Sequence, residues 1–356
     1  MTHRSQIRFF EDRRERGVPM ALATVYQTEG STYSKAGATM LVDGDGMFQG
    51  MLSGGCLEGD LAVRARVAIE SGTAQQAVYD LRGGDDELWG MGVGCEGVMR
   101  VLLQPLYADR QYQPWVALHE AALGLEETFA VVVIDGADGA PAGATLLSAA
   151  CGEPTAFGLS ASAKDALAEY VAQRHPDTAA AFGETLVAGV KLGLLTYRVP
   201  RQPRLLVFGA GLDAGPVVRF AAELGWHCTL VDHRPAYLEQ GGFDSADRML
   251  SVPAAEAFRH VKLDEFDLAI VMSHHLASDR EYLSQLAGAS VPYVGLLGPP
   301  ARRNRLMSEL GTLAGKLEGR LNAPAGIDIG GRGPAAIALS ILAEMQMHLG
   351  ARSGGL

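Results

Sequence analysis

The sequence lacks any apolar run of the roughly 18 residues that a membrane-spanning helix needs. Its first residues, MTHRSQIRFFEDRRERG, are charged throughout and contain no apolar segment of the kind that a signal peptide carries. We therefore expect a protein without a membrane span that is located in the cytoplasm.

Positive charge is also scarce. Lysine and arginine number 30 against 41 aspartate and glutamate residues, which gives a formal net charge of −11. Nucleic-acid binding rests mainly on lysine and arginine that neutralise backbone phosphates, so we expect neither DNA nor RNA as the main partner. Hydrophobic residues at 48% and charged residues at 20% are ordinary for a soluble globular protein.

Cysteine is rare, and its spacing excludes two common roles. The four cysteines are Cys56, Cys95, Cys151 and Cys228. No C-x-x-C pair marks a structural zinc site or a dithiol redox centre, and in a reducing cytoplasm we expect free thiols. The length of 356 residues exceeds the usual limit of a single core, so two or three domains are expected.

The stretch SGGCLEGD at residues 53–60 has the composition of a site, because it combines a thiol and two carboxylates with three glycines. Gly54 and Gly55 let the backbone take positive φ and approach a ligand closely, so they present Cys56 to that ligand. Free cysteine is also among the most buried residue types, and a purely structural role for Cys56 stays open at this point.

The flanking sequence predicts where this cysteine sits in the fold. Residues 47–52 predict a short strand and residues 61–69 (LAVRARVAI) predict a helix, so Cys56 lies on a strand-to-helix turn near a helix N-terminus. The dipole and the unpaired N–H groups of such a terminus favour an anion, and a cysteine there tends to have a lowered pKa.

A second glycine-rich stretch, WGMGVGCEG at residues 89–97, presents Cys95. Four glycines in nine residues are incompatible with a helix or a regular sheet. Two cysteines on two glycine-rich loops of one small domain are a more specific signal than either loop alone, and two unrelated tight turns with buried thiols are the alternative. We take Cys56, Glu58 and Cys95 as candidate catalytic residues.

From about residue 201 the pattern changes to alternating strand and helix. Residues 204–208 (RLLVF) predict a buried strand, which is followed by GAGLDA at residues 209–214, a predicted helix over residues 216–224, and a strand that ends at Asp232. This is the G-x-G-x-x-A fingerprint of a dinucleotide-binding unit, with an acidic residue 21 positions after Gly211.

Ligands of an open α/β sheet collect at the carboxyl ends of its strands. Two more predicted strands end before Ser-His-His at residues 273–275 and before Gly298. Asp232 is a candidate ribose ligand or a turn cap, the two histidines are ligands or turn residues, and Arg302 and Arg303 bind phosphate or are solvated. The candidate ligand-binding residues of this rim are Gly209, Gly211, Asp213, Ala214, Asp232, His274 and Gly298.

These patterns predict an α/β protein in three parts. Residues 1–110 are expected to form an N-terminal α+β domain with the glycine-rich cysteine loops, and residues 111–200 a middle α/β extension packed on it. Residues 201–356 are expected to form a Rossmann-like, doubly wound parallel sheet.

With these stretches in hand, the chain closely resembles the XdhC/CoxI family, the accessory factors that bind molybdenum cofactor and help to mature xanthine dehydrogenase and related molybdenum hydroxylases. The likeness covers nearly the whole length. It is carried by TEGST at 28–32, LSGGCLEGD at 52–60, WGMGVGC at 89–95, LVFGAG at 206–211 with Asp213 and Ala214, and GIDIG at 326–330.

The resemblance implies a chaperone that transiently holds molybdenum cofactor, as molybdopterin or its dinucleotide form. It implies delivery to an apo molybdenum hydroxylase of the xanthine dehydrogenase or carbon-monoxide-dehydrogenase type, after a cysteine desulfurase has supplied sulfur, and we expect a homodimer. Molybdenum and its sulfido ligand are soft partners suited to thiolate, so the resemblance implies Cys56 as a metal ligand, with Gly54 and Gly55 beside it as cofactor-binding residues. Cys95 is the second candidate for the metal end. The phosphate end is expected at the Rossmann glycine turn.

Two other functions stay open. An NAD(P)-dependent oxidoreductase with His274 as acid or base is motivated by the Rossmann unit alone, and an assembly factor without a ligand is the third possibility. The chaperone hypothesis makes a geometric prediction, because one ligand has to bridge two domains. It predicts a cleft lined by Cys56, Glu58, Gly211 and Asp232 from one chain or from two.

Overall fold

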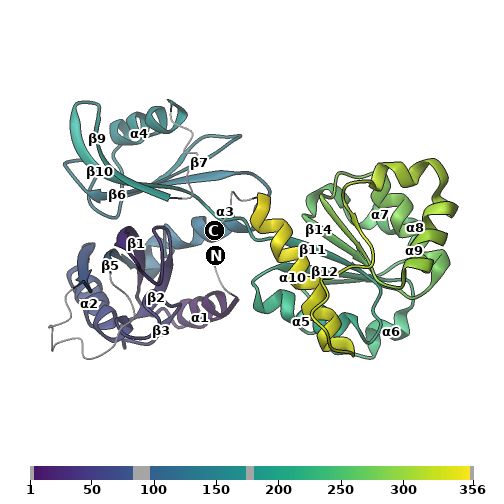
Figure 1. Cartoon of the computed structure of the whole chain (residues 1–356). Coiled ribbons are helices and arrows are strands. Elements are labelled where there is room, and N and C mark those ends of the chain that lie inside the picture. The colour runs from purple at the N-terminus through teal and green to yellow at the C-terminus, as the bar shows by residue number, and fades with distance from the viewer. Residues whose placement is uncertain (1–3, 83–96, 174–179, 353–356) are drawn as a thin grey trace. The chain divides into compact units, whose positions relative to one another are not determined.

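The computed structural model describes residues 4–82, 97–173 and 180–352. They form two compact units, Met1–Arg201 and Gln202–Leu356, and each unit has its own apolar cores. The N-terminal unit contains two antiparallel five-stranded sheets and the C-terminal unit contains one parallel six-stranded sheet (Figure 1).

The first sheet of the N-terminal unit has the strand order β3-β2-β1-β5-β4. Side chains alternate between the two faces of a strand, so Ala21, Ala23 and Val25 of β1 pack towards α2 while Leu22 and Tyr26 face the second sheet. The elements are α1 (Arg4–Glu15), β1 (Met20–Gly30), β2 (Thr39–Asp43), β3 (Phe48–Gln49), α2 (Glu58–Ser71), β4 (Gln75–Asp80) and β5 (Gly97–Leu106).

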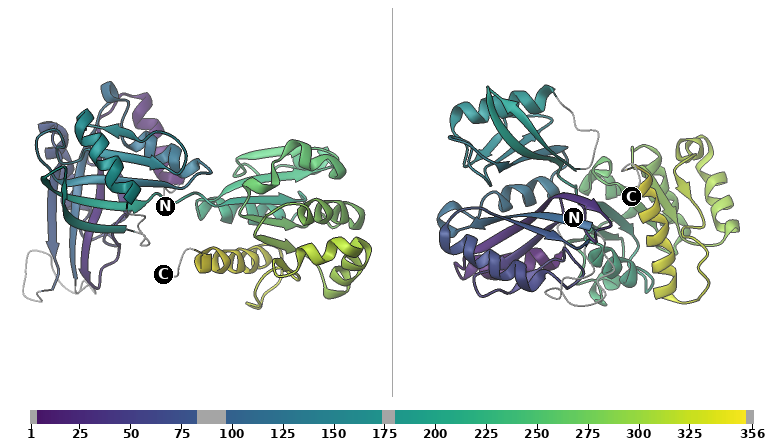
Figure 2. Two further views of the ribbon diagram at one scale, coloured as in Figure 1. Left: turned by 90° about the horizontal axis from the view of Figure 1, so that it is seen from above. Right: turned by 60° about the vertical axis from the view of Figure 1, so that its left-hand side comes forward.

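The second sheet has the order β8-β7-β6-β10-β9. Trp115 and Leu118 of α3 fill the core between the two sheets, and α4 covers the opposite face of the second sheet with Leu167 and Val171 (Figure 1). The right-hand view of Figure 2 shows the two sheets of this unit as separate layers. The elements are α3 (Trp115–Leu123), β6 (Thr128–Asp135), β7 (Thr145–Ala149), β8 (Thr155–Phe157), α4 (Ala161–Gln173), β9 (Ala180–Val187) and β10 (Val190–Arg198).

The C-terminal sheet has the order β13-β12-β11-β14-β15-β16, which in chain order is the 3-2-1-4-5-6 arrangement of dinucleotide-binding Rossmann folds. Helices α5 and α10 cover one face, and α7, α8 and α9 cover the other (Figure 1). The elements are β11 (Arg204–Phe208), α5 (Ala214–Glu223), β12 (His227–Asp232), α6 (Pro235–Glu239), β13 (Arg248–Ser251), α7 (Ala257–His260), β14 (Leu268–Val271), α8 (Leu276–Ala287), β15 (Tyr293–Leu296), α9 (Pro300–Leu310), β16 (Leu321–Asn322) and α10 (Pro334–Arg352).

The register of this sheet determines what meets at its rim. Phe208 at the end of β11 pairs with Val231 of β12 and with Val271 of β14. The residues that follow these strands therefore leave the sheet at the same level. Because the strand order reverses between β11 and β14, a ligand crevice is expected above these ends.

The predicted fold class is confirmed, with local differences. The first helix after the Cys56 turn begins at Glu58 rather than at residue 61, and the strand predicted over residues 47–52 is reduced to β3 (Phe48–Gln49). Within the described ranges no helix is long and apolar enough to cross a membrane.

Candidate functional site

Cys56 is exposed on the turn between β3 and α2. Gly54 and Gly55 take φ values of 79° and 110°, in the left-handed region that favours glycine. A Cβ at Gly54 would lie 3.4 Å from the ring of Tyr33, whereas one at Gly55 would meet nothing within 4 Å. The thiol of Cys56 donates to the carbonyl oxygen of Ser53 over 3.3 Å. The turn therefore presents the thiol outward, and the alternative of a cysteine buried in the core is wrong for this residue.

Glu58 organises this turn from the first turn of α2. Its side chain is buried, and its carboxylate accepts a hydrogen bond from the Ser53 hydroxyl. Four backbone N–H groups also donate to it, from Leu52 (2.9 Å), Ser53 (2.9 Å), Gly55 (3.1 Å) and Leu57 (3.2 Å). The expectation of unpaired N–H groups that await an anion is thus corrected for these residues, because a carboxylate of the chain itself fills that position. A direct catalytic role of Glu58 stays a prediction; its contacts give it a positioning role.

The pKa of Glu58 leads to a pH dependence of stability. Burial alone would raise this pKa, but the hydrogen bonds from Ser53 and Leu52 outweigh burial and hold it below its ordinary value. A carboxyl whose pKa is lower in the folded state contributes stability above its unfolded pKa, and this contribution is lost as the pH falls through the folded pKa. We expect this contribution to the free energy of unfolding to be constant above about pH 5 and to be lost as the pH falls below about 4, and we expect the loss to be smaller in Glu58→Gln. Urea unfolding at several pH values measures both, and equal pH dependence in the two proteins would contradict this role.

The second carboxylate of the stretch, Asp60, joins α2 to the sheet. It accepts hydrogen bonds of 2.6 Å from the hydroxyl of Tyr79 on β4 and from Nε of Arg64. Burial acts to raise the pKa of Asp60, and these two hydrogen bonds lower it below its ordinary value. Asp60 therefore anchors the helix that follows the turn. Exposed apolar side chains near the turn in sequence or in space are Tyr33, Met47, Phe48 and Met51.

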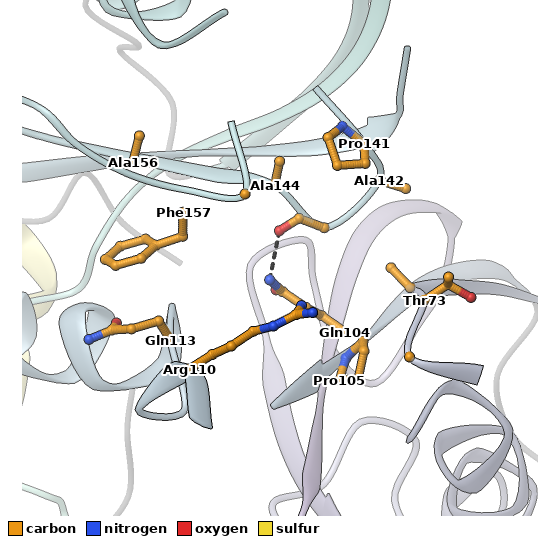
Figure 3. Close-up of a pocket in the computed structure, with 14 residues that line it drawn as sticks. Thr73, Gln104, Pro105, Arg110, Gln113, Pro141, Ala142, Ala144, Ala156 and Phe157 are labelled. Atoms are coloured by element: carbon orange, nitrogen blue, oxygen red, sulfur yellow. Dashed lines mark hydrogen bonds between the residues drawn. The ribbon is translucent and has the colours of Figure 1, made fainter. Parts of the chain in front are cut away.

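A cavity of about 610 Å³ also lies in the N-terminal unit, between its two sheets. Residues 72–74 and Gln104 line one side, and residues 141–144 and 156–158 line the other. Figure 3 shows the side chain of Arg110 extending across it near Gln104, whose amide donates to the carbonyl oxygen of Gly143 over 2.6 Å. None of the residues that the sequence predicts for a site lines this cavity.

In the C-terminal unit the glycine turn after β11 lies against the loop after β14. Gly209 has φ 113°, and a Cβ there would lie 2.5 Å from both the N and Cα atoms of Ser273. A Cβ at Gly211 would lie 3.5 Å from the ring of His274. Only glycine at position 209 allows the backbone of this turn to approach the backbone of Ser273 so closely. The approach brings the predicted glycine turn next to His274.

His274 and Asp213 form a pair at the start of α5. Nε2 of His274 lies 3.2 Å from Oδ2 of Asp213, and His274 takes a positive φ of 58°. Asp213 is the N-cap residue of α5 but makes no capping hydrogen bond with its side chain. Ala214 begins the helix and is fully buried in the core, so of this pair of predicted residues only Asp213 has its side chain at the rim.

Asp232 is fully buried at the end of β12. Its carboxylate accepts hydrogen bonds from the N–H of Ala210 (2.6 Å) and from Arg234, through the backbone N–H (2.8 Å), Nε (3.0 Å) and Nη2 (2.8 Å). Burial acts to raise the pKa of Asp232, and these hydrogen bonds lower it below its ordinary value. Contact with a ribose stays a prediction for Asp232, whose oxygens are already engaged. Sequence reasoning misses Arg234, although its place two residues after the strand-terminal aspartate is a signal.

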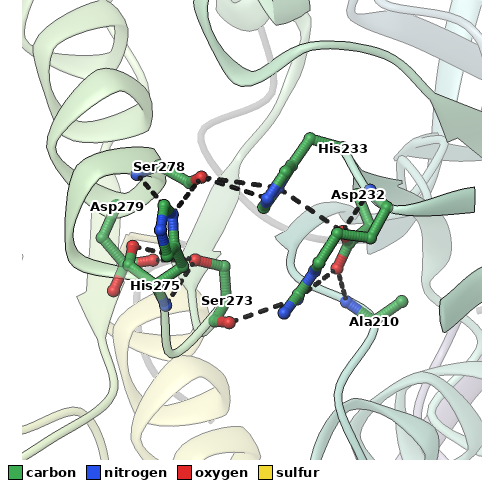
Figure 4. Close-up of polar contacts among 8 residues, drawn as sticks. Ala210, Asp232, His233, Ser273, His275, Ser278 and Asp279 are labelled. Carbon is green, nitrogen blue, oxygen red and sulfur yellow. Dashed lines mark hydrogen bonds and ion pairs between the residues drawn. The ribbon is translucent and has the colours of Figure 1, made fainter.

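Polar side chains from the end of β12, from the loop after β14 and from the first turn of α8 lie close together (Figure 4). The rings of His233 and His275 lie 5.6 Å apart, and the hydroxyl of Ser278 lies 2.9 Å from Nδ1 of His275 and 3.4 Å from His233. The hydroxyl of Ser273 donates to Asp279. His275 acts as the N-cap of α8 by accepting from the N–H of Ser278, as expected for a turn residue.

Gly298 allows a close approach of Arg302. It has φ 130°, and a Cβ there would lie 2.7 Å from Cδ of Arg302. Arg302 pairs with the fully buried Asp279 through Nη2 (2.6 Å) and Nε (3.2 Å), so its side chain is not simply solvated. Phosphate binding stays a prediction for Arg302 and for Arg303, which is exposed.

Cys95 lies outside the described residues. Within the described part of the chain no group of three or more His, Cys, Asp or Glu side chains is arranged to hold a metal ion. A metal ligated through Cys56 would therefore need further ligands from its own cofactor or from outside the described residues.

The fold and the turn define an α/β protein in which a Rossmann unit follows an α+β unit with an exposed thiol on a glycine turn. Residues 205–345 match the model of the XdhC Rossmann domain, and residues 13–80 match that of the XdhC and CoxI family. A probable xanthine dehydrogenase component of Bacillus subtilis (strain 168) is 30% identical over 332 residues, which are 91% of each chain. The chain belongs to the XdhC/CoxI family, and the resemblance inferred from the motifs is confirmed.

Two further proteins are similar to this chain. The crystal structure of a xanthine dehydrogenase from Bacillus halodurans has a TM-score of 0.78 and 28% identity, and covers 97% of this chain and 96% of that chain. The uncharacterized protein YqeB of Escherichia coli (strain K12) is 29% identical over 160 residues, 44% of this chain and 29% of its own length.

Proposed function

We propose that this chain is a maturation factor for a molybdenum hydroxylase of the xanthine dehydrogenase or carbon-monoxide-dehydrogenase type. In this role it holds molybdenum cofactor transiently, supports its sulfuration and delivers it to the apoenzyme. The observation that carries the proposal is the exposed thiol of Cys56 on a turn held by the buried carboxylate of Glu58, in a chain that belongs to the XdhC/CoxI family.

The chemistry of the turn fits the metal end of this cargo. Thiolate is a soft ligand suited to molybdenum and to its sulfido sulfur, and Cys56 is the exposed soft group of the turn. Met47 and Met51, both exposed, stand shortly before it in the sequence. Glu58 holds the backbone on both sides of the thiol, so the sulfur has a defined position when cargo arrives.

The glycine turn of the C-terminal unit fits the phosphate end. Backbone N–H groups at a helix N-terminus favour phosphate, and α5 begins there without a side-chain cap. The bridging of Cys56 and this turn by one ligand stays part of the proposal, in a monomer or in a homodimer. A cysteine desulfurase as the sulfur donor and an apo hydroxylase as the recipient complete it.

Replacement of Cys56 tests the proposal directly. We purify Cys56→Ser from a host that makes molybdopterin. We expect it to retain no more than about one tenth of the cofactor that the wild type retains, because a ligand to the metal end is lost. Mass spectrometry of released small molecules measures retention, and the activity of a co-expressed hydroxylase measures maturation.

Cys151→Ser is the matched control, because Cys151 is also an exposed free cysteine of the N-terminal unit. Its retention is expected to equal that of the wild type. Equal retention and equal maturation by Cys56→Ser would remove Cys56 from the proposed role.

An NAD(P)-dependent oxidoreductase is the second candidate, and the Rossmann strand order together with the G-x-G-x-x-A turn favours it. In that case His274, paired with Asp213, is the candidate acid or base. Turnover of a substrate with NAD(P)H in the absence of molybdenum cofactor would favour this function over the maturation role.

A further inference from the structure

The end of the second strand of a Rossmann βαβ unit determines which nucleotide the unit accepts. In such units a carboxylate at this point binds the adenosine ribose hydroxyls of NAD, whereas an arginine nearby accommodates the ribose 2′-phosphate of NADP. Here β12 ends at Asp232, and His233 and Arg234 follow. Whether the carboxylate or the arginine has hydrogen-bonding capacity left for the ribose therefore indicates whether the unit accepts NAD or NADP.

Asp232 has no capacity left for a ribose. Its side chain is fully buried, and four hydrogen bonds from Ala210 and Arg234 engage both of its oxygens. A ribose diol could donate to this carboxylate only by displacing the guanidinium of Arg234. Breaking a buried, hydrogen-bonded ion pair is strongly destabilising, because each charge loses its compensation.

Arg234 still has donors. A guanidinium carries five N–H groups; Nε and Nη2 donate to Asp232, and Nη2 also donates to the carbonyl oxygen of Ser273 over 3.2 Å. Among the described residues no acceptor bonds Nη1, and about a quarter of the side chain (26%) is exposed. The guanidinium also stacks on the ring of Tyr237, 3.6 Å from its centroid, so it is held before a ligand binds.

The charges around Arg234 do not oppose an anion. The two fully buried carboxylates of this rim, Asp232 and Asp279, are each paired with an arginine, Arg234 and Arg302 respectively. The imidazole of His233 stands next to Arg234, with Nδ1 3.5 Å from Asp232. A phosphate oxygen at Nη1 would accept charge-assisted hydrogen bonds, which are stronger than bonds between neutral groups.

We propose that the C-terminal unit binds a dinucleotide whose adenosine ribose carries a 2′-phosphate, and that Arg234 is the residue that binds this phosphate. Asp232 then orients Arg234 and does not contact the ribose. The glycine turn at Gly209 and Gly211 receives the pyrophosphate. The inference concerns this rim alone and does not rest on the proposed cargo.

Calorimetry on the full chain with NADP⁺ and NAD⁺ is the test, because the two probes differ by one phosphate. We expect NADP⁺ to bind roughly ten to a hundred times more tightly, the range given by one set of hydrogen bonds to a charged group. Adenosine 2′-monophosphate is expected to compete with NADP⁺, and adenosine 5′-monophosphate is expected to compete far less. Equal affinity for both dinucleotides, tighter binding of NAD⁺, binding of neither, or equal competition by both monophosphates would overturn the inference.

The variant Arg234→Lys assigns the effect to a residue. It keeps one positive charge beside Asp232 but loses the planar fork and the stack on Tyr237. We expect its affinity for NADP⁺ to fall to about that for NAD⁺, which should change little. Arg219→Lys is the control, because Arg219 is an exposed arginine on α5 that lies over the ring of Phe220. If Arg234→Lys does not fold, the comparison of the two dinucleotides on the wild type still decides.

The failure of this inference can be told apart from the failure of the proposed function. Retention of molybdenum cofactor by a chain that binds no NADP⁺ once the cofactor has been removed would overturn the inference and leave the maturation role standing. Tight and selective binding of NADP⁺ by a chain that retains no molybdenum cofactor would support the inference and contradict the maturation role.

Discussion

Glu58→Gln is expected to lower the free energy of unfolding of the N-terminal unit by about 2–4 kcal/mol. The substitution removes a buried, charged acceptor, and hydrogen bonds to a charged acceptor are stronger than those to the neutral amide that replaces it. The carboxylate accepts from four backbone N–H groups and one hydroxyl. Glutamine has nearly the same shape, but its amide NH₂ replaces one of the two accepting oxygens. In one orientation that group faces the buried N–H groups of Leu52 and Ser53 and leaves them without this acceptor. In the other it faces the N–H groups of Gly55 and Leu57, of which Leu57 also donates to Oγ of Ser53.

The matched control is Glu70→Gln, which makes the same change at an exposed position of the same helix. Urea unfolding measures stability, and hydrogen exchange at residues 52–57 measures the order of the turn. We expect faster exchange at these amides only in Glu58→Gln, together with weaker retention of the proposed cargo. A stability within about 0.5 kcal/mol of the control, the usual range for surface substitutions, would show that the turn does not depend on this carboxylate.

The C-terminal unit is well predicted from the sequence because its signals are local. A buried strand, a glycine turn, a helix and a strand with a terminal aspartate follow one another within residues 204–232. Each element is specified by neighbours in the chain, so spacing alone places Gly209 and Asp232 at one edge of a parallel sheet. The same holds for the turn that presents Cys56 between its two positive-φ glycines and α2.

Residues 111–200 are predicted less completely because their elements depend on partners distant in sequence. Helix α3 (Trp115–Leu123) is stabilised by the core between the two sheets, and no local cap marks its start. The hairpin of β9 and β10 turns at Ala188 and Gly189, both with positive φ. Ala-Gly is a weaker signal for such a turn than Asn-Gly or Asp-Gly.

Side-chain roles are harder to predict than positions. The sequence suggests Glu58 as a catalytic residue beside Cys56, which stays a prediction, and its hydrogen bonds show a second role that the sequence does not reveal, because they hold the backbone of the turn. It places Asp232 correctly at the rim, whereas the arginine that engages this aspartate is not foreseen. In both cases the residue type and spacing indicate a polar site. Only the three-dimensional contacts show whether a carboxylate oxygen is available to a ligand or already accepts hydrogen bonds from the protein. Whether Cys56 faces the Rossmann rim stays a prediction.

Gly209→Ala is expected to destabilise the C-terminal unit by about 2–4 kcal/mol, since overpacking and an unfavourable φ add up. The new Cβ would lie 2.5 Å from N and Cα of Ser273 and 2.7 Å from the carbonyl carbon of Met272. These are backbone atoms of the two residues that follow β14, and no rotamer change can move them. The alanine also has to hold a φ of 113°, which L-residues rarely adopt.

Gly315→Ala is the control in the same unit, because a Cβ at Gly315 would meet nothing within 4 Å and its φ is not in the left-handed region. Hydrogen exchange of the β11 and β14 amides reports on the stability of this unit within the full chain. This measurement is chosen because a chain of two units need not unfold in a single transition. We expect faster exchange in both strands of Gly209→Ala and loss of nucleotide binding, while the N-terminal unit exchanges as before. Native-like protection of β14 in the variant would mean that the turn can move away from Ser273, so the contact between the two rim loops would not determine the shape of the ligand site.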